Sequence, residues 1–238
     1  MKLLENASLE AISLYMQNNA RDFDLDFRLE SFSCKMVSTD KKEWRRNIRN
    51  SNDKNQLQPL SPPEEQYLSQ FGNFNTNGRL RHTSEVSLSG SDNDADENYS
   101  LVGTVSRRTL FNLVAVLNLS YSDYDFSQTK SERFSLANIE DCIANVNAKL
   151  IATVPAFMEM KDRFWGVINE EIRIDECILY SYIPEYTNDP FTEDGCIWAF
   201  NYMFWNRNLK RILSFLCCRA LRSASLDISS EQLWVDDE

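Results

Sequence analysis

The chain has 238 residues, of which 42% are hydrophobic and 12% aromatic, so it is long and apolar enough to bury a sizeable core. Its formal net charge of −11 and its isoelectric point of about 4.7 argue against a general nucleic-acid binder, which needs a basic surface to displace counterions from phosphates. No apolar run approaches the ~20 residues of a membrane span, and the N-terminal stretch carries Glu5 and Glu10 and lacks the apolar core of a signal peptide.

We expect residues 1–37 to form the first part of a globular domain. A helix is expected over residues 2–17, capped by Asn6 or Ser8, with one face formed by Leu4, Ala11, Leu14 and Tyr15. A half-buried strand follows, in which charged residues alternate with Leu25, Phe27 and Leu29. The apolar residues then move to even positions, which predicts a bulge near residues 30–31.

Residues 38–106 predict a disordered regulatory insertion, because Asn, Ser, Asp and Gln dominate and no apolar period persists. Its first third is basic and its last third is acidic; the basic residues are Lys41, Lys42, Arg45, Arg46 and Arg49. Closing a loop of this length costs about 4 kcal/mol. Each large side chain buried from the first strand returns about 1.5–3 kcal/mol. The first strand is therefore expected to dock on the rest of the domain.

We expect residues 107–222 to form the remainder of the domain. The run 107–121 favours a strand by its length and β-branched content, with a helix as the alternative. Amphipathic stripes predict two helices, from Ile139 to Leu150 and from Phe157 to Ile172. Three strands are expected at about 174–183, 196–205 and 209–218. One face of the second strand is formed by Trp198, Phe200, Tyr202 and Phe204.

The last two strands are expected to meet at a hairpin turn, Asn206–Asn208, because Asn tolerates left-handed backbone conformations. Residues 223–238 lose all pattern and end as an acidic tail. Together these elements predict an α+β domain, an antiparallel sheet of about five strands packed with about three helices and interrupted by the long insertion.

The residue types argue against catalysis. The single histidine, His82, lies in the predicted insertion, where the fixed geometry of a Ser-His or Cys-His system is hard to build. The six glycines form no phosphate-binding fingerprint. The six cysteines form no C-x-x-C pair, so we expect reduced thiols rather than disulfides or a zinc site. No cofactor, catalytic residue or metal ligand is predicted.

Two charged turns are candidate partner-binding sites. The stretch 185–195 contains Asp189, Glu193 and Asp194; a solvated turn is the simpler interpretation, and a divalent-metal enzyme is the alternative. Around the hairpin lie Arg207, Lys210 and Arg211. They either solvate and protect an edge, or bind phosphate or an acidic partner, as in a direct DNA-binding repressor. Glu170 and Glu171, at the end of an amphipathic helix, are expected to be solvated.

The predicted insertion offers phosphorylation sites. Ser61 precedes a proline, as proline-directed kinases require, and Ser84 has arginines at −5 and −3, as basophilic kinases prefer. Ser89 and Ser91 each have an aspartate at +3, which suits acidophilic kinases. A phosphate adds about −1.5 to −2 charges, enough to change binding to a charged partner. We therefore predict regulation by phosphorylation at Ser61 and Ser84.

Several stretches of the predicted core share their sequence with one known family. In chain order they are MKLLEN (1–6), ESFSCKM (30–36), DYDFS (123–127), FWGVINEEI (164–172), ECILYSY (176–182) and DPFTEDGCIWAFNYMFWNRNLKRILSF (189–215). By these stretches the chain resembles the Maf-type repressors of RNA polymerase III transcription, which are unrelated to the basic-leucine-zipper Maf proteins. It departs from them in the insertion and in its short acidic tail.

The resemblance implies a regulator that is not an enzyme. Such proteins bind RNA polymerase III and the TFIIB-related subunit of the initiation factor TFIIIB, and so block initiation. Protein kinases and phosphatases control them in response to nutrients, and they shuttle between nucleus and cytoplasm. For this chain we expect the same partners and localisation, with no membrane association and no strong direct nucleic-acid binding.

Overall fold

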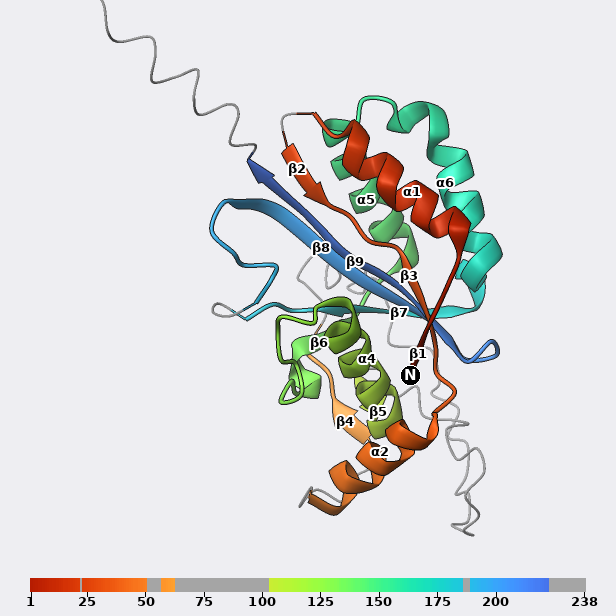
Figure 1. Ribbon diagram of the computed structural model, residues 1–238, viewed down its shortest axis with the longest axis vertical. Coiled ribbons are helices and arrows are strands. Elements are labelled where there is room, and N and C mark those ends of the chain that lie inside the picture. Colours follow the sequence, from red (N-terminus) through yellow and green to blue (C-terminus); the bar gives the residue numbers. More distant parts are fainter. Residues whose placement is uncertain (22, 51–56, 63–102, 186–188, 223–238) are drawn as a thin grey trace, which may run out of the picture.

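The structure is a computed structural model that describes residues 1–21, 23–50, 57–62, 103–185 and 189–222 (Figure 1). Within these ranges seven strands form one antiparallel sheet, in the order β1-β3-β9-β8-β7-β6 with β2 also paired to β9. The strands are β1 (Lys2–Leu4), β2 (Phe23–Asp26), β3 (Glu30–Ser33), β6 (Phe134–Leu136), β7 (Cys177–Tyr182), β8 (Cys196–Asn206) and β9 (Arg211–Arg222). The predicted α+β class with an antiparallel sheet is confirmed.

Helices cover both faces of this sheet. They are α1 (Ala7–Asn19), α2 (Ser38–Asn50), α4 (Arg107–Ser120), α5 (Ile139–Thr153) and α6 (Phe157–Ile172). In Figure 1, β8 and β9 run diagonally through the molecule, with α1, α5 and α6 on one side and α4 on the other. A second, two-stranded sheet pairs β4 (Leu57–Pro59) with β5 (Thr104–Ser106). Among the described residues no helix has the length and apolar character needed to span a membrane.

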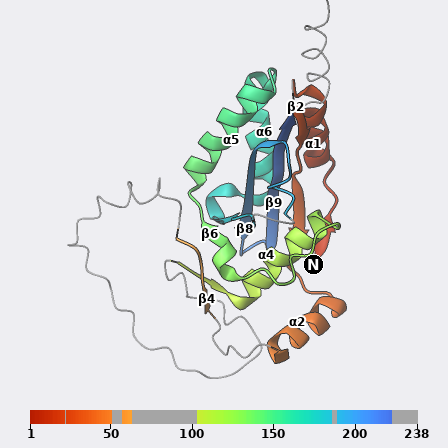
Figure 2. The same ribbon diagram turned by 90° about the vertical axis from the view of Figure 1, so that its left-hand side faces the viewer.

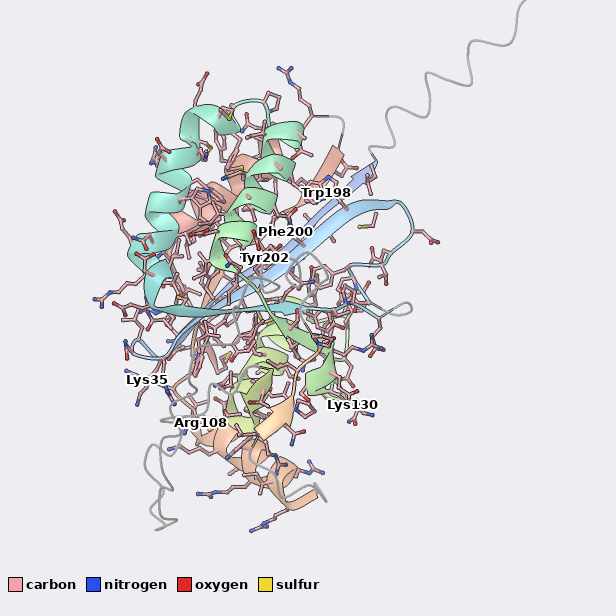
Figure 3. The ribbon with its side chains drawn as sticks, turned by 180° about the vertical axis from the view of Figure 1, so that it is seen from behind. Lys35, Arg108, Lys130, Trp198, Phe200 and Tyr202 are labelled. Carbon is pink, nitrogen blue, oxygen red and sulfur yellow. The ribbon has the colours of Figure 1, made fainter. Side chains whose placement is uncertain are left out.

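The first core lies between the sheet and the helices α1, α5 and α6. The four aromatic residues predicted to share one face of β8 do so: Phe200 and Phe204 are buried in this core, and Trp198 and Tyr202 pack at its edge. The Phe200 ring stacks on the rings of Trp198 and Tyr202, with centroids 5.8 and 5.7 Å apart (Figure 3). The period-2 pattern of this strand therefore predicted its buried face correctly.

The second core lies on the opposite face of the sheet, under α4. Leu113, Val116 and Leu117 of α4 pack there with Met203 of β8 and Ile212 of β9. Neighbouring residues of β8 thus point into different cores, since Phe204 belongs to the first and Met203 to the second. This burial of both faces explains why residues 196–205 of β8 are apolar except for Asn201.

The favoured prediction of a strand at 107–121 is wrong, and the alternative, a helix, is correct. The buried positions of α4 are spaced by three and four residues: Thr109, Asn112, Leu113, Val116, Leu117 and Ser120. The alternation of a strand would bury Leu119 together with Leu117, but Leu119 is 52% exposed. Ser106 caps the helix by accepting a hydrogen bond from the Thr109 backbone N–H at 3.0 Å. In a strand the Thr109 N–H would donate to a neighbouring strand. Here it donates to the capping side chain, as is typical of the first turn of a helix.

The N-terminal helix begins later than predicted. Asn6 caps α1 by accepting bonds from the N–H groups of Ser8 and Leu9, and residues 2–4 before it form a strand. The predicted face was wrong, because Leu14 is 50% exposed. The buried residues are Leu9, Ile12 and Met16.

The first predicted strand is divided into β2 and β3, with no ladder pairing at residues 27–29 rather than a bulge at 30–31. Phe27 and Leu29 are buried in the first core, whereas Phe32 and Cys34 are buried in the second. The shift of the apolar pattern to even positions therefore marks a change of core. It arises because the sheet is covered on both faces.

The predicted insertion is shorter than residues 38–106. Residues 38–50 form the helix α2, whose Trp44 ring packs against Phe111 of α4 with centroids 5.4 Å apart. Residues 57–59 and 104–106 pair as β4 and β5. These ends were expected to lack structure and do not. Residues 63–102 and the acidic tail at 223–238 lie outside the described part of the chain.

The packing of the first core predicts how far the free energy of unfolding falls when one aromatic ring is removed. Phe164 is fully buried, and its ring centroid lies 5.1 to 6.2 Å from those of Phe27, Phe157, Trp165 and Phe215. Phe164→Ala should lower the free energy of unfolding by about 3–5 kcal/mol, measured by urea denaturation. Met158→Ala on the same helix, where the side chain is 60% exposed, should change it by less than about 0.5 kcal/mol. A loss below about 1 kcal/mol for Phe164→Ala would contradict this packing.

Candidate partner-binding surfaces

The acidic stretch forms the connection between β7 and β8, and its first carboxylate points inward. Asp189 is 3% exposed and accepts hydrogen bonds from the Tyr182 hydroxyl at 2.7 Å and from the backbone N–H groups of Glu185 and Phe191, both at 3.0 Å. Its expected place on a solvated turn is therefore wrong. The carboxylate holds the loop together, because each of its oxygens already accepts bonds from the loop or from β7.

Burial and the hydrogen bond to Asp189 raise the pKa of Tyr182 well above its ordinary value. The phenol therefore stays protonated and acts as a donor at neutral pH. Phe191, next in the loop, is also buried and packs its ring against those of Tyr121 and Tyr182, at 5.5 and 6.0 Å. The described part of the loop thus has an aromatic and hydrogen-bonded base, formed by Asp189 and Phe191.

Glu193 and Asp194 differ in their surroundings. Glu193 is half-buried and accepts a hydrogen bond from the Tyr124 hydroxyl, whereas Asp194 is exposed. Glu193 also lines an open cavity of about 330 Å³, together with Asp26, Arg28, Tyr121, Asp123, Tyr124 and Pro190. Within the described residues no group of three or more His, Cys, Asp or Glu side chains is placed to hold a metal ion.

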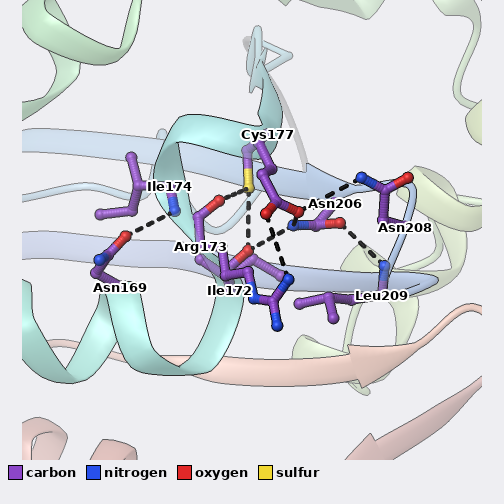
Figure 4. Close-up of polar contacts among 9 residues, drawn as sticks. Asn169, Ile172, Arg173, Ile174, Cys177, Asn206, Asn208 and Leu209 are labelled. Atoms are coloured by element: carbon purple, nitrogen blue, oxygen red, sulfur yellow. Dashed lines mark hydrogen bonds and ion pairs between the residues drawn. The ribbon is translucent and has the colours of Figure 1, made fainter.

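The hairpin between β8 and β9 is fixed from inside by Asn206 (Figure 4). This side chain is fully buried; its amide donates to the Ile172 carbonyl at 2.9 Å and to Glu176 at 3.3 Å. Its oxygen accepts from the Leu209 N–H at 3.0 Å. The left-handed residue of the turn is Lys210, with φ of 52°, rather than one of the asparagines. The asparagine was misassigned because its side chain, not its backbone, shapes the turn.

The three cations at the hairpin have different environments. Arg207 and Lys210 are exposed, and the Arg207 guanidinium lies 6.0 Å from the centroid of the Trp205 ring. Arg211 is half-buried and donates to the Glu171 carboxylate at 2.7 Å and to its backbone carbonyl at 3.0 Å. Arg211 therefore has a structural partner, which leaves Arg207 and Lys210 as the cations that the hairpin presents to solvent.

Glu171 was predicted on a solvated face, and this is wrong, since its side chain is only 13% exposed. Besides Arg211, it accepts hydrogen bonds from Ser31 at 2.6 Å and from Asn6 at 2.8 Å. One carboxylate thus joins α6 to β9, β3 and the start of α1. The sequence held a signal for this role, because Glu171 follows Phe164 and Ile168 at helical spacing and so borders the apolar stripe.

Of the two predicted phosphorylation sites, the structure describes only Ser61. Ser61 is half-buried at the end of β4, where its backbone N–H donates to the Phe134 carbonyl at 2.8 Å and it pairs with Ser135 of β6. Ser84 lies outside the described residues. The structure thus places Ser61 at the junction of the small sheet and the large one.

Two solved structures share this fold. They are crystal structures of citrus MAF1 in two space groups, with TM-scores of 0.58 and 0.54 and sequence identities of 23% and 24%. The similar regions cover 91% and 90% of this chain, and 100% and 98% of theirs. The sequence also matches the family model of the Maf1 regulator over residues 25–216. The chain therefore belongs to the Maf1 regulator family.

Curated relatives carry the name of a repressor of RNA polymerase III transcription. The one from Schizosaccharomyces pombe is 28% identical over 217 residues, which cover 90% of this chain and 80% of that protein. The one from Dictyostelium discoideum is 38% identical over 116 residues, 48% of this chain and 41% of that protein. The one from Saccharomyces cerevisiae is 29% identical over 126 residues, 52% of this chain and 30% of that protein. The chain thus spans less than half the length of two of these relatives.

The position of Asp189 predicts a structural role that can be separated from partner binding. Asp189→Ala removes the acceptor of three hydrogen bonds and should lower the free energy of unfolding by about 3–5 kcal/mol, measured by urea denaturation. Asp194→Ala, which removes an exposed carboxylate from the same loop, should change it by less than about 0.5 kcal/mol. Equal, small effects of the two substitutions would show that Asp189 does not stabilise the loop.

Proposed function

We propose that this chain represses transcription by RNA polymerase III through contacts with the transcription machinery. The observation that carries the proposal is the family match over residues 25–216, which includes both charged turns. It is supported by the S. pombe repressor of RNA polymerase III transcription, which aligns with 90% of this chain. The partners we propose are RNA polymerase III itself and the TFIIB-related subunit of TFIIIB.

The charged turns are the surfaces that we assign to these partners. Asp194 and Arg207 are exposed and lie just before and just after β8. The residues of β8 itself are held in place because they pack into both cores. Charges on turns that a rigid sheet supports lose little conformational freedom on binding and so retain more of their interaction energy. Charge pairs at the rim of an interface also speed association and select the correct partner.

Both alternative functions have less support. A divalent-metal enzyme needs free carboxylate oxygens, but those of Asp189 accept bonds from three donors. A repressor that grips DNA through the hairpin would use Arg207, Lys210 and Arg211, but Arg211 is paired with Glu171. Two exposed cations give a small electrostatic footprint for a phosphate backbone.

A reconstituted transcription reaction tests the proposed function. The purified chain, added to a tRNA gene with RNA polymerase III and TFIIIB, should reduce the transcript in proportion to its concentration. A parallel reaction with RNA polymerase II should be unaffected. Asp194→Lys combined with Arg207→Glu should weaken the inhibition by roughly tenfold, which corresponds to about 1.4 kcal/mol of lost binding.

The matched control for this variant is Glu170→Lys combined with Arg163→Glu. Both residues are exposed on α6, and the pair makes the same two charge reversals away from the turns. It should inhibit like the unchanged chain. Equal loss in both variants would remove the turns from the interface, and no inhibition by the unchanged chain would refute the proposed function.

We also propose that phosphorylation at Ser61 and Ser84 relieves repression and keeps the chain in the cytoplasm, so that it shuttles between nucleus and cytoplasm. At Ser61 a phosphate would place about −1.5 to −2 charges beside β6. Ser61→Ala combined with Ser84→Ala should therefore repress, and stay nuclear, under nutrient-rich conditions. Transcript levels and the location of a fluorescently tagged chain measure this. Unchanged repression and location would exclude these two serines from the control.

A further inference from the structure

The helix α2 carries a face of one charge. Its five cations are all exposed: Lys41, Lys42, Arg45, Arg46 and Arg49. Because successive helical residues turn by about 100°, these five fall within an arc of about 140° and along about 12 Å of the axis. The two carboxylates of the helix, Asp40 and Glu43, lie outside that arc.

This face is presented by a fixed helix. On the side away from the cations, Trp44 packs its ring edge-on against Phe111, at 5.4 Å and 64°. At the first turn, Asp40 forms an ion pair with the Met1 ammonium and accepts a bond from the Val37 N–H at 3.0 Å. The helix is therefore anchored at its start and on its inner side, and the cations face outward.

The helix also projects from the body of the molecule. Figures 1 and 2 show α2 at one end, beyond α4 and away from the large sheet. Figure 3 shows Lys35 and Arg108 at this same end, and both are exposed. Among the described residues, no ion pair compensates any of the five cations of α2. A chain with a net charge of −11 thus has one protruding basic end.

We propose that this basic face of α2 binds the phosphate backbone of a nucleic-acid duplex. A helix with its side chains is about 10–12 Å wide, which matches the roughly 12 Å major groove of B-form DNA. Three of the five cations are arginines, whose planar guanidinium groups bind phosphate oxygens in pairs. The large apolar residues of the helix, Trp44 and Ile48, lie outside the cationic arc, so the face offers little apolar area to a protein partner.

The acidic remainder of the chain limits this binding to the helix itself. Repulsion from the rest of the surface keeps the affinity low and the contact short, which suits backbone recognition without sequence reading. It also explains why the overall charge predicts no strong binding to nucleic acid. The α2 face is independent of the proposed function, because its test needs only the chain and a duplex.

Fluorescence anisotropy with a labelled 20-base-pair DNA duplex and an RNA duplex of the same sequence tests the proposal. Binding should lie in the micromolar range at 25 mM KCl and weaken up to 200 mM KCl, with a slope of log K against log salt of about −4 for DNA. Tighter binding to DNA would indicate that α2 enters the groove, since the A-form major groove is too narrow. Equal binding would indicate contact with phosphates alone; both results support the proposal.

The variant Arg45→Gln, Arg46→Gln, Arg49→Gln should bind the duplexes at least about tenfold more weakly and reduce the slope for DNA to about −2, since Lys41 and Lys42 remain. These side chains are exposed, so circular dichroism should show an unchanged fold. The control Arg21→Gln, Lys130→Gln, Arg163→Gln makes the same change in net charge at exposed positions away from both α2 and the hairpin. It should bind within about twofold of the unchanged chain.

Three outcomes would overturn the proposal. The first is no salt-dependent binding to either duplex by the unchanged chain. The second is an equal loss in the two triple variants, which would mean that net charge rather than the α2 face decides binding. The third is tighter binding of a polyglutamate peptide than of both duplexes, lost in the α2 variant alone. That result would assign the face to an acidic protein segment.

Discussion

The pairing of β8 with β9 is the contact on which the rest of the structure depends, because both faces of these strands are buried. Phe204 and Leu213 point into the first core, and Met203 and Ile212 into the second. A slip of one residue in their register would exchange the two sets of side chains and leave both helical layers without their matching surfaces. At about 1.5–3 kcal/mol per large side chain, this double burial outweighs any single contact at the turns.

Glu171 couples the helical layer to that sheet. A half-buried carboxylate is stable only where hydrogen bonds and an opposite charge replace the water it has lost. Arg211, Ser31 and Asn6 supply them, from β9, β3 and the start of α1. The hairpin that presents Arg207 and Lys210 is therefore held to α6 at two places, through Arg211 on one strand and through Asn206 on the other. The three hairpin cations, alike in the sequence, thus divide into Arg211, which stabilises the fold, and Arg207 and Lys210, which face solvent.

The sequence predicts the elements whose apolar period is unambiguous, such as α6 and the aromatic face of β8. It misleads at α4, where a run rich in Leu and Val fits two periods and the Ser106 cap decides between them. It misses α2, whose polar residues show no apolar period and whose anchor, Trp44, packs on Phe111 far along the chain. Asp189 could not be identified as buried either, because its burial depends on Tyr182 and on a backbone path that composition does not reveal.

The small sheet of β4 and β5 pairs residues 57–59 with residues 104–106, which are far apart in the sequence. The Leu60 N–H donates to the Gly103 carbonyl at 2.8 Å, so the described residues on the two sides of 63–102 are hydrogen-bonded to each other. Because the entropy of closing a loop grows only with the logarithm of its length, doubling such a segment costs only about 0.6 kcal/mol. The fold thus specifies where this segment is attached and leaves its length almost free to vary.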